Sequence, residues 1–454
     1  MSINDLRSLL DYLASLGQLV HIGTTVDKDL ELGQAASKHA GGPAVYFERV
    51  KGYSVPVVTG LYWNINNIAR MLNCRTAREL VDKFSCAMRA RVKPLVVDDG
   101  PVKEQIITKN IDLQRMFPIP WHCQRDAGPF ITAGVAVSKD PETGIRSQSI
   151  HRMQVKGPNK TGFVVAKGTG RHMERMLASA ASRNRSLEVA VVLGLDPWNM
   201  LASQVSGREA PYPTDKYELA GALQNRAIEL VRCETVDLEV PANAEIVLEG
   251  EILPNVLEDE GPFTELTGLC DGSPSQANVF MVRAVTHREN PIYQTILGGG
   301  GQFENPVLKS VSYSASACKF IRDSVPSITA LNVSANSACM HAYVSIKKEL
   351  EGQQRNAIIS TFASFPDLKL VVVVDDDVDV FNLQDVEWAL AMRFQGDRDI
   401  LVIPGARGHD IDPSADSGLG CKVGVDATAR LGGRASQKRV QYEHVASSSD
   451  RVER

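Results

Sequence analysis

The sequence lacks the features that mark several common classes of protein. No apolar run reaches the ~18 residues that a membrane span needs, and the N-terminus has neither the basic start nor the small-residue cleavage site of a signal peptide. The eight cysteines form no CxxC pair, which favours free thiols in a reducing cytoplasm over disulfides or a zinc site. The sequence contains neither the HExxH motif of zinc peptidases nor the GxSxG motif of α/β-hydrolases, so no motif indicates either class. We therefore expect a cytoplasmic protein with no membrane partner.

What the chain does contain is the composition of an ordinary globular protein. Its 454 residues are 43% hydrophobic and 23% charged, which is enough for two or three domains with substantial cores. The formal charge of −5 argues against a nucleic-acid partner. Asp375, Asp376 and Asp377 follow a buried, strand-like run, where a solvated strand end is favoured over a magnesium site.

The patterning divides the chain into three parts. Residues 1–110 mix short apolar runs with helical ones, beginning with leucines at helical spacing (Leu6 to Leu16), and predict an α/β domain. Residues 111–305 contain many β-branched, strand-like segments, which predicts a barrel or a strongly curved sheet. Two stretches in this part, 172–183 and 217–231, have helical patterns. Residues 306–454 return to α/β patterning, with a βαβ-like unit over 367–405 and a polar C-terminal tail.

Two acidic residues and one arginine are the first candidates for chemistry. Glu260 and Glu265 flank a Gly-Pro-Phe turn in EDEGPFTELTG, and such acids are ordinarily solvated. In SIHRMQVKG, read as one strand over 149–157, Arg152 would share a face with an apolar residue and need a carboxylate or phosphate partner. Taken alone, an arginine in such a segment is more often a surface residue than a functional one. A histidine such as His172 in GTGRHMER is likewise more often the first residue of a helix than a ligand.

The order of several motifs along the chain favours functional roles for these residues. SIHR, then RH after a glycine-rich turn, LAGALQ, VPANAEIVLEG and EGPFTE follow one another as they do in the UbiD-like decarboxylases. The resemblance runs from the DLR opening to VDDDVDVF, IPGARGH and CKVGVDAT, and is strongest between residues 145 and 268. It implies that the central domain is a split β-barrel of the flavin-reductase type and that the protein forms a homodimer or a larger homo-oligomer.

The resemblance also implies an activity. UbiD-like enzymes remove CO2 from, or add it to, unsaturated and aromatic carbons with prenylated FMN, which a flavin prenyltransferase supplies. We therefore expect non-oxidative, reversible decarboxylation of an aromatic, heteroaromatic or α,β-unsaturated carboxylic acid, with a mild preference for a heteroaromatic one. Two alternatives stay open: a carboxylase that runs in the reverse direction, and a non-catalytic flavin-binding or scaffold protein.

By the same resemblance, Arg152, Glu260 and Glu265 form the catalytic trio. Arg152 would hold Glu260 ionised, while Glu265 would be the proton donor. The residues expected to bind the cofactor are Ser149, Ile150, His151, Arg152, Arg171, His172 and Lys422. Residues 298–320 are expected to line the substrate pocket.

The implied metal site departs from the family pattern. Manganese, with potassium nearby, normally bridges the flavin phosphate to an Asn or Asp, a His and a Glu. Here His172 matches, but Ser147 stands at the Asn position and Lys216 at the usual Glu position, with Glu218 two residues later. Either Glu218 reaches the metal as its third ligand, or the site is altered and Lys216 itself neutralises the phosphate.

Overall fold

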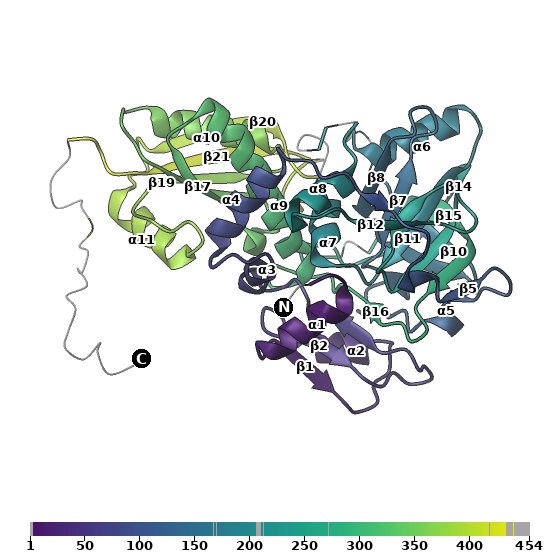
Figure 1. The fold of residues 1–454 in the computed structure, drawn as a ribbon. Helices are drawn as coiled ribbons and strands as arrows, with labels where there is room; N and C mark the ends of the chain where they lie inside the picture. The colour runs from purple at the N-terminus through teal and green to yellow at the C-terminus, as the bar shows by residue number, and fades with distance from the viewer. Residues whose placement is uncertain are drawn as a thin grey trace, which may run out of the picture.

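The fold was analysed in a computed structural model that describes residues 3–166, 168, 170–205, 210–211, 213–270, 272–416, 418–432 and 439. Helices and sheets are mixed along the whole chain (Figure 1). The expected α/β character is confirmed. The expected polar tail lies almost entirely outside the described residues.

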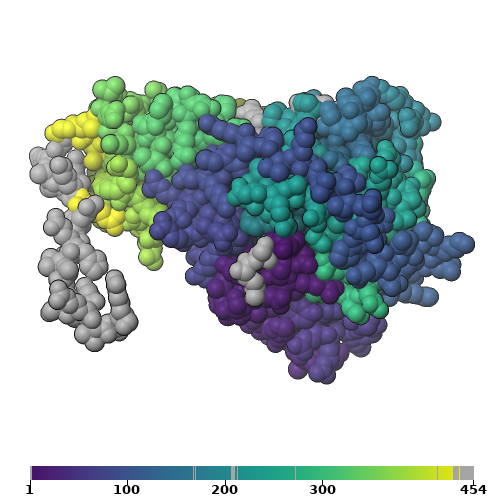
Figure 2. All heavy atoms as spheres, viewed as in Figure 1, coloured from purple at the N-terminus to yellow at the C-terminus, as the bar shows by residue number. Residues whose placement is uncertain are grey.

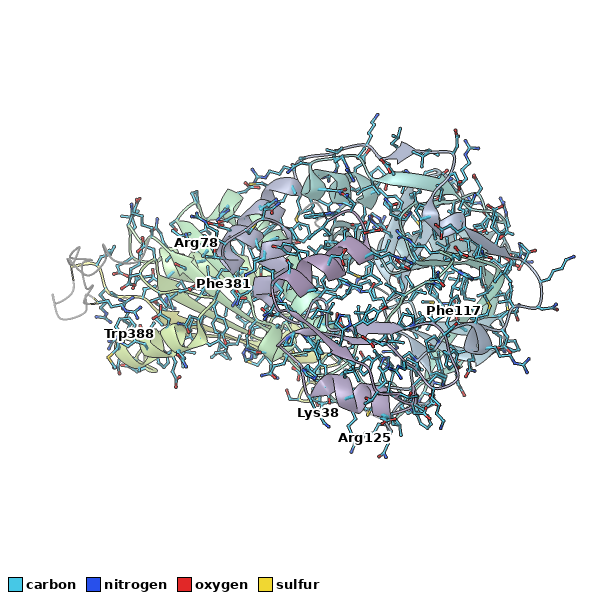
Figure 3. All side chains as sticks on the ribbon, turned by 60° about the horizontal axis from the view of Figure 1, so that its bottom comes forward. Lys38, Arg78, Phe117, Arg125, Phe381 and Trp388 are labelled. Carbon is cyan, nitrogen blue, oxygen red and sulfur yellow. The ribbon has the colours of Figure 1, made fainter. Side chains whose placement is uncertain are left out.

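The three parts of the chain occupy different regions of the molecule. In Figure 2 the first residues of the chain (purple) lie at the bottom and the residues that follow them (blue) extend across the centre, whereas the central residues (teal) lie at the right and most residues beyond 300 (green to yellow) at the upper left. Figure 3 shows Phe117 and Trp388 toward opposite ends of the molecule. Phe117 packs against His287 and Tyr293, whereas Trp388 stacks under Arg393. No helix in the described ranges is long and apolar enough to cross a membrane.

The N-terminal part is a small sheet with helices around it. Its elements are α1 (Leu6–Ser15), β1 (Leu19–Ile22), α2 (Glu31–Ser37), β2 (Ala44–Phe47), β3 (Val57–Thr59), α3 (Ile65–Met71), α4 (Ala77–Ala87), β4 (Leu95–Val96), the 3-10 helix η1 (Pro101–Lys103) and β5 (Gln105–Ile107). Helix α1 forms as the leucine spacing predicts: Asp5 caps its first turn, and Gly17 follows its end at φ +66°. The sheet order is β1-β2-β3-β16.

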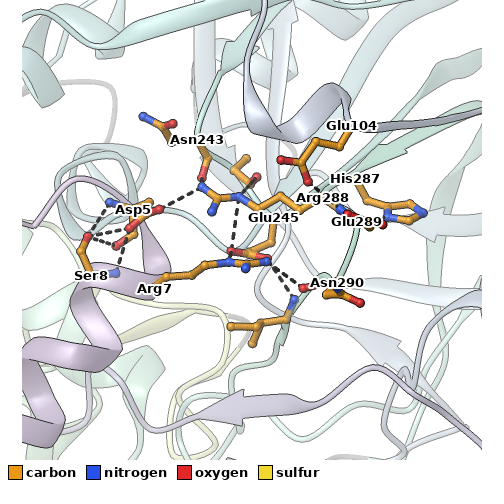
Figure 4. A network of polar contacts seen from close by, with 12 residues as sticks. Asp5, Arg7, Ser8, Glu104, Asn243, Glu245, His287, Arg288, Glu289 and Asn290 are labelled. Carbon is orange, nitrogen blue, oxygen red and sulfur yellow. Dashed lines mark hydrogen bonds and ion pairs between the residues drawn. The ribbon is translucent and has the colours of Figure 1, made fainter.

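A buried ionic network ties α1 to the central part (Figure 4). Glu245 is buried and accepts two hydrogen bonds from Arg7, at 2.9 and 3.1 Å. Arg288 lies 3.5 Å from the same carboxylate and donates to Asp5 at 2.9 Å. Asp5 and Arg7 lie at the start of α1, Glu245 directly precedes β14, and Arg288 directly follows β15. The network therefore holds the start of this helix against the segments before β14 and after β15.

The central part is dominated by a nine-stranded sheet in the order β6-β9-β10-β15-β14-β11-β7-β8, with β5 paired to β15. Its elements are α5 (Leu113–Met116), β6 (Phe130–Ile131), β7 (Val135–Lys139), β8 (Arg146–Ile150), β9 (Met153–Gly157), β10 (Lys160–Phe163), α6 (His172–Ser182), β11 (Leu187–Leu193), α7 (Pro197–Gln204), α8 (Lys216–Gln224), β12 (Glu229–Arg232), β13 (Glu239–Pro241), β14 (Ile246–Glu260), β15 (Ser275–His287) and β16 (Tyr293–Gln294). Among the described strands, the two ends of the sheet order do not pair, so closure into a split barrel stays a prediction.

Two local expectations in this part were wrong. The segment over 149–157 is not one strand, because β8 ends at Ile150 and β9 begins at Met153. The helix expected over 217–231 ends after Gln224, where Asn225 adopts a left-handed conformation, and the β-branched residues that follow form β12. Strands also cross the expected boundary at residue 110: β5 joins the central sheet, and β16 joins the N-terminal one.

The C-terminal part is a five-stranded sheet in the order β17-β18-β19-β21-β20. Its elements are α9 (Glu304–Ser324), β17 (Ile328–Val333), the 3-10 helix η2 (Ala335–Ser337), β18 (His341–Ile346), α10 (Gln353–Ser364), β19 (Leu370–Asp375), α11 (Leu383–Arg393), β20 (Ile400–Arg407) and β21 (Leu419–Ala427). Strand β19 is buried and parallel to both neighbours, as its apolar run predicts. The expected βαβ-like unit was wrong, because β20 pairs antiparallel with β21 instead of running parallel to β19.

The acidic run after β19 is held by an arginine. Arg393 of α11 donates to Asp375 at 2.7 Å and to Asp377 at 2.6 Å. The pKa of Asp377 is lowered, first by this hydrogen bond, because the guanidinium favours the ionised carboxylate. The run is therefore a structural ion-pair site in this fold.

Helix α9 joins the three parts. It contacts α4, α7, α10 and β17, and it lies in the middle of the molecule in Figure 1. Its first residue, Glu304, is fully buried and accepts hydrogen bonds from Thr59 Oγ1 and from the backbone of Gly60 and Tyr62, at 2.8 to 3.1 Å. Burial raises the pKa of Glu304 to about 7. The start of α9 is thus anchored to the N-terminal sheet by a carboxylate that changes charge near neutral pH.

We expect this carboxylate to make stability depend on pH. Because its pKa is raised, Glu304 contributes stability that is fully present below about pH 4.5 and is lost as the pH rises through about 7, on the order of 3 kcal/mol in all. Glu304→Gln does not titrate, so the wild type should exceed it in thermal midpoint most clearly at pH 5. The gap should narrow toward pH 8. Melting curves of both proteins across this range test it, and a gap that widens with pH would contradict it.

Candidate active site

A cavity of about 330 Å³ lies between the central sheet, α9 and the loop after β20. Its walls combine apolar side chains with a few charged ones. The described residues that line it are Thr132, Ser147, Ser149, Ile150, His151, Arg152, Val164, Val165, Ala166, Arg171, His172, Met173, Ser203, Gln204, Val205, Lys216, Phe263, Glu265, Leu266, Ile296, Gly298, Asn305, Leu308, Lys309, Tyr313, His409 and Ile411. A cavity in which apolar side chains surround convergent polar and charged groups is typical of a small-molecule site.

The break between β8 and β9 directs Arg152 to this cavity. His151 bonds Ser149 Oγ at 2.8 Å and the carbonyl of Val164 at 3.0 Å, and its ring stacks on Phe163 at 4.5 Å between centroids. Burial lowers the pKa of His151 to about 4, so the ring is neutral near pH 7. This neutral, doubly bonded histidine fixes the two-residue break. Arg152, the next residue, lines the cavity and lies over the ring of Phe263 at 5.0 Å.

Arg152 bonds both predicted acids. Its Nε lies 3.4 Å from Glu260 Oε1, and its Nη1 bonds Glu265 Oε1 at closer range. The structure therefore brings together all three residues of the predicted trio, although Arg152 and Glu260 lie more than a hundred positions apart in the chain. The roles that the resemblance implies for the three residues stay predictions.

The two acids differ in their surroundings. Glu260 ends β14, is only 1% exposed and does not line the cavity, whereas the side chain of Glu265 is 32% exposed and does. Burial raises the pKa of Glu260, and Arg152 opposes this shift. Glu260 Oε2 has no hydrogen-bond partner among the described residues. Glu260 therefore supports Arg152 from behind, and Glu265 is the acid that a ligand in the cavity can meet.

One buried residue that sequence reasoning missed holds the turn between the two acids. Asp126 accepts hydrogen bonds from the backbone N–H of Thr264 at 2.7 Å and from its hydroxyl at 2.8 Å. Burial raises the pKa of Asp126, which lies near Arg152 as well. A single aspartate in the segment WHCQRDAG carries no pattern that would have indicated this contact.

A second polar cluster lies where β8, α6 and α8 meet. His172, the first residue of α6, bonds Ser147 Oγ of β8 at 3.0 Å. Lys216, the first residue of α8, is only 5% exposed and donates to the carbonyl of Gln148 at 2.7 Å. His172, Ser147 and Lys216 all line the cavity. Burial, followed by the charge of Lys216, lowers the pKa of His172 to about 4.

Glu218 is not among the described residues that line the cavity. In an α-helix, residues two positions apart point about 200° away from each other. Since Lys216 of α8 lines the cavity, Glu218 of the same helix faces elsewhere. The structure thus brings Ser147 and His172 together but does not bring Glu218 to them.

These residues do not fit a divalent metal ion. Manganese takes oxygen and imidazole ligands, with carboxylates as its usual anionic donors. Glu265 is the only carboxylate among the described residues of the cavity, and Arg152 holds it. Lys216 adds a positive charge to the same cluster as His172. Within the part of the chain that the structure describes, no group of three or more His, Cys, Asp or Glu side chains could hold a metal ion.

The residues predicted to bind the cofactor fall into two groups. Those that line the cavity are Ser149, Ile150, His151, Arg152, Arg171 and His172. Lys422 of β21 is outside the described lining, because its ammonium donates to the carbonyls of Pro366 and Leu368, each at 2.6 Å. Burial lowers the pKa of Lys422.

The expectation that residues 298–320 line the pocket is confirmed for five of them: Gly298, Asn305, Leu308, Lys309 and Tyr313. Sequence reasoning missed the neighbouring part of the wall, which the loop after β20 supplies through His409 and Ile411. Asp367 lies 3.7 Å from His409 and 3.9 Å from Lys309. The only signal for His409 was its place in the IPGARGH motif.

Comparison with protein families agrees with this architecture. Three family models match the chain in succession, described as the N-terminal (residues 10–85), Rift-related (95–301) and C-terminal (307–427) domains of 3-octaprenyl-4-hydroxybenzoate carboxy-lyase, UbiD. An anhydromevalonate phosphate decarboxylase from Methanothermobacter thermautotrophicus is 38% identical over 87% of this chain and 90% of its own length.

Solved structures give the same result. The UbiD-class enzyme HmfF from Pelotomaculum thermopropionicum in complex with FMN has a TM-score of 0.92 at 38% identity, covering 99% of both chains. An evolved dimeric form of that enzyme in complex with prFMN has a TM-score of 0.88 at 36% identity, covering 99% of this chain and all of its own. Flavin complexes are therefore known for proteins of this fold.

We expect the space behind Arg152 to tolerate no added atom. A methyl group on Gly162 of β10 would overlap Glu260 Oε2 and Cδ, so Gly162→Ala must displace the buried carboxylate. We expect a cost of about 1–3 kcal/mol, as for other overpacked sites. Gly157→Ala is the matched control, since its methyl group would meet Lys160 Cβ at an ordinary 3.5 Å in the same hairpin. Equal thermal midpoints for the two variants would contradict the tight packing of Glu260.

Proposed function

Because the chain belongs to the UbiD family of carboxy-lyases, we propose that it is a prenylated-FMN-dependent, non-oxidative and reversible decarboxylase in which Glu265 donates the proton. The observation that carries this proposal is the contact of Arg152 with both Glu260 and Glu265 at the wall of the cavity. The proposed substrate is an aromatic, heteroaromatic or α,β-unsaturated carboxylic acid. Apolar side chains such as Leu266 and Ile296 line the cavity together with Arg152 and Glu265, and this supports a substrate with an unsaturated carbon skeleton and a carboxylate.

Arg152 has two tasks in this proposal. A guanidinium has five N–H groups, and two of them bond the glutamates, so three remain to orient the carboxylate that leaves as CO2. The ring of Phe263, 5.0 Å from the guanidinium, covers one face of it and limits access of water. Prenylated FMN, when bound, supplies the electron sink that takes the electrons of the breaking C–CO2 bond.

The trio also stores the proton. Two carboxylates share one guanidinium, so the three groups carry a net charge of −1, and uptake of one proton makes them neutral. Burial raises the pKa of Glu260, which favours uptake of this proton by the trio. Glu265 delivers the proton to the carbon that has lost CO2, and its carboxylate then pairs with Arg152. Because the Glu265 side chain is partly exposed, water can return the proton.

Several finer parts of the proposal rest on the resemblance alone. These are the supply of the cofactor by a flavin prenyltransferase, a cytoplasmic location, a homodimeric or larger assembly, and potassium near the flavin phosphate. The manganese that the resemblance also implies is left out of the proposal, because the described residues of the cavity do not fit it. The decisive experiment for the activity is a screen of aromatic, heteroaromatic and α,β-unsaturated acids for CO2 release, with enzyme produced alongside a flavin prenyltransferase. Flavin-loaded protein that releases CO2 from none of them would contradict the proposal.

We expect Glu265→Gln to abolish decarboxylation while the flavin stays bound. The amide keeps the shape of the side chain but carries no acidic proton, and loss of a general acid costs about 10²–10⁴-fold in rate. The measurement is the rate of CO2 release together with the flavin absorbance of the purified protein. Glu258→Gln is the control, because Glu258 of the same strand as Glu260 pairs with Lys160 outside the cavity. A Glu265→Gln rate within threefold of wild type would remove Glu265 as the donor.

Arg152→Ala should reduce both the rate and the flavin affinity. Removing one partner of a buried charge pair costs about 3–5 kcal/mol, and here it leaves Glu260 buried without its guanidinium. Arg152→Lys should restore little, since an ammonium lacks the planar fork that bonds two carboxylates at once. Flavin titration and CO2 release measure the two effects. Normal occupancy and rate in Arg152→Ala would show that the trio is not the catalytic site.

A further inference from the structure

The charge of Lys216 lies in an unusual place. It is the first residue of α8, where the helix dipole favours anions and disfavours a cation. It is also almost fully buried, and taking an ammonium out of water is costly unless its surroundings compensate. The carbonyls of Gln148, at 2.7 Å, and Ser203, at 3.4 Å, accept hydrogen bonds from it. The helix dipole and burial both disfavour a positive charge at this position. A lysine retained there indicates that its ammonium interacts with an anion when a ligand fills the cavity.

The surroundings of Lys216 suit an anion. Helix α6 is eleven residues long and helix α8 nine. Both helices begin at the cavity, α6 with His172 and α8 with Lys216. Backbone N–H groups at helix starts are unsatisfied within the helix and bind phosphate readily. Ser147 adds a hydroxyl, and Arg171, the residue that precedes α6, also lines the cavity. The N-cap of α8, Asp215, already accepts a hydrogen bond from the N–H of Tyr217 at 2.9 Å, so α8 offers a phosphate only its other first-turn N–H groups. The Asp215 carboxylate is itself paired with Arg146 at 2.8 Å.

The same cluster opposes a metal cation. Ser147 is a neutral ligand, and His172 is an imidazole whose neighbour carries a full positive charge. Two like charges a few ångströms apart repel each other strongly in a partly buried site. A phosphate, by contrast, is attracted by the ammonium and by the helix starts together.

We propose that Lys216 replaces the divalent metal ion of this family, so that its ammonium neutralises the flavin phosphate directly. This inference deepens the proposed function and rests on it only in so far as the chain binds a flavin. Lys216 is then a cofactor-binding residue, Ser147 and His172 complete a phosphate site, and no manganese is needed there.

The test is the affinity for FMN compared with riboflavin, which lacks the phosphate, by quenching of flavin fluorescence in the full-length protein. The wild type should bind FMN equally well, within twofold, in EDTA and in manganese, and metal analysis of the FMN complex should find no stoichiometric manganese. Lys216→Met should weaken FMN binding by about tenfold or more but leave riboflavin binding unchanged. Lys348→Met is the control, because Lys348 is also buried but bonds Glu351 and Thr428 away from the cavity.

Lys216→Glu extends the test, since it supplies the carboxylate that a divalent ion needs beside His172 and Ser147. We expect this variant to bind FMN only when manganese is present and to retain manganese in the complex. The proposal is overturned if EDTA removes FMN from the wild type, if manganese strengthens wild-type binding tenfold, or if Lys216→Met weakens FMN and riboflavin equally. Each of these outcomes concerns binding alone, so a failure of Glu265 as proton donor would be seen separately in CO2 release.

Discussion

The positive charge of Arg152 is the constraint on which the rest of the site depends. A guanidinium cannot lose its proton on burial, so it must be neutralised where it lies. Glu260 neutralises it from inside the sheet and Glu265 from the cavity. This requirement explains why β14 ends where it does, why β10 has a glycine opposite Glu260, and why Asp126 holds the turn between the two acids.

The contacts of Arg152 in the structure differ from the roles that the resemblance implies for the trio. The resemblance implies a division of labour in which Arg152 keeps Glu260 ionised and leaves Glu265 free to donate. In the structure Arg152 bonds both acids, and burial acts on Glu260. In the proposed mechanism the three groups together hold one proton, and Glu265 delivers it because Glu265, and not Glu260, faces the cavity.

Sequence reasoning succeeded where local pattern decides structure and failed where contacts between distant segments decide it. The leucines of α1, the apolar run of β19 and the helical pattern of α6 were predictable from the spacing of their apolar residues. The trio was predictable only through the order of motifs, because neither the acids nor Arg152 carries a signal alone. The break at His151 was not predictable, since it depends on the carbonyl of Val164 and the ring of Phe163. Nor was the cavity wall at His409, which comes from another part of the chain.

Helix α9 has a consequence for how variation is tolerated across the chain. Its first residue is held by the backbone of Gly60 and Tyr62, and within the next two turns it presents Asn305, Leu308 and Lys309 to the cavity. Farther along, it packs against α4, α10 and β17. The part of the helix that lines the cavity is therefore positioned by the N-terminal part of the chain. Substitutions near residue 60, far from any ligand in sequence, should therefore alter substrate selectivity as readily as changes in the cavity itself, and a search for altered selectivity has reason to begin there.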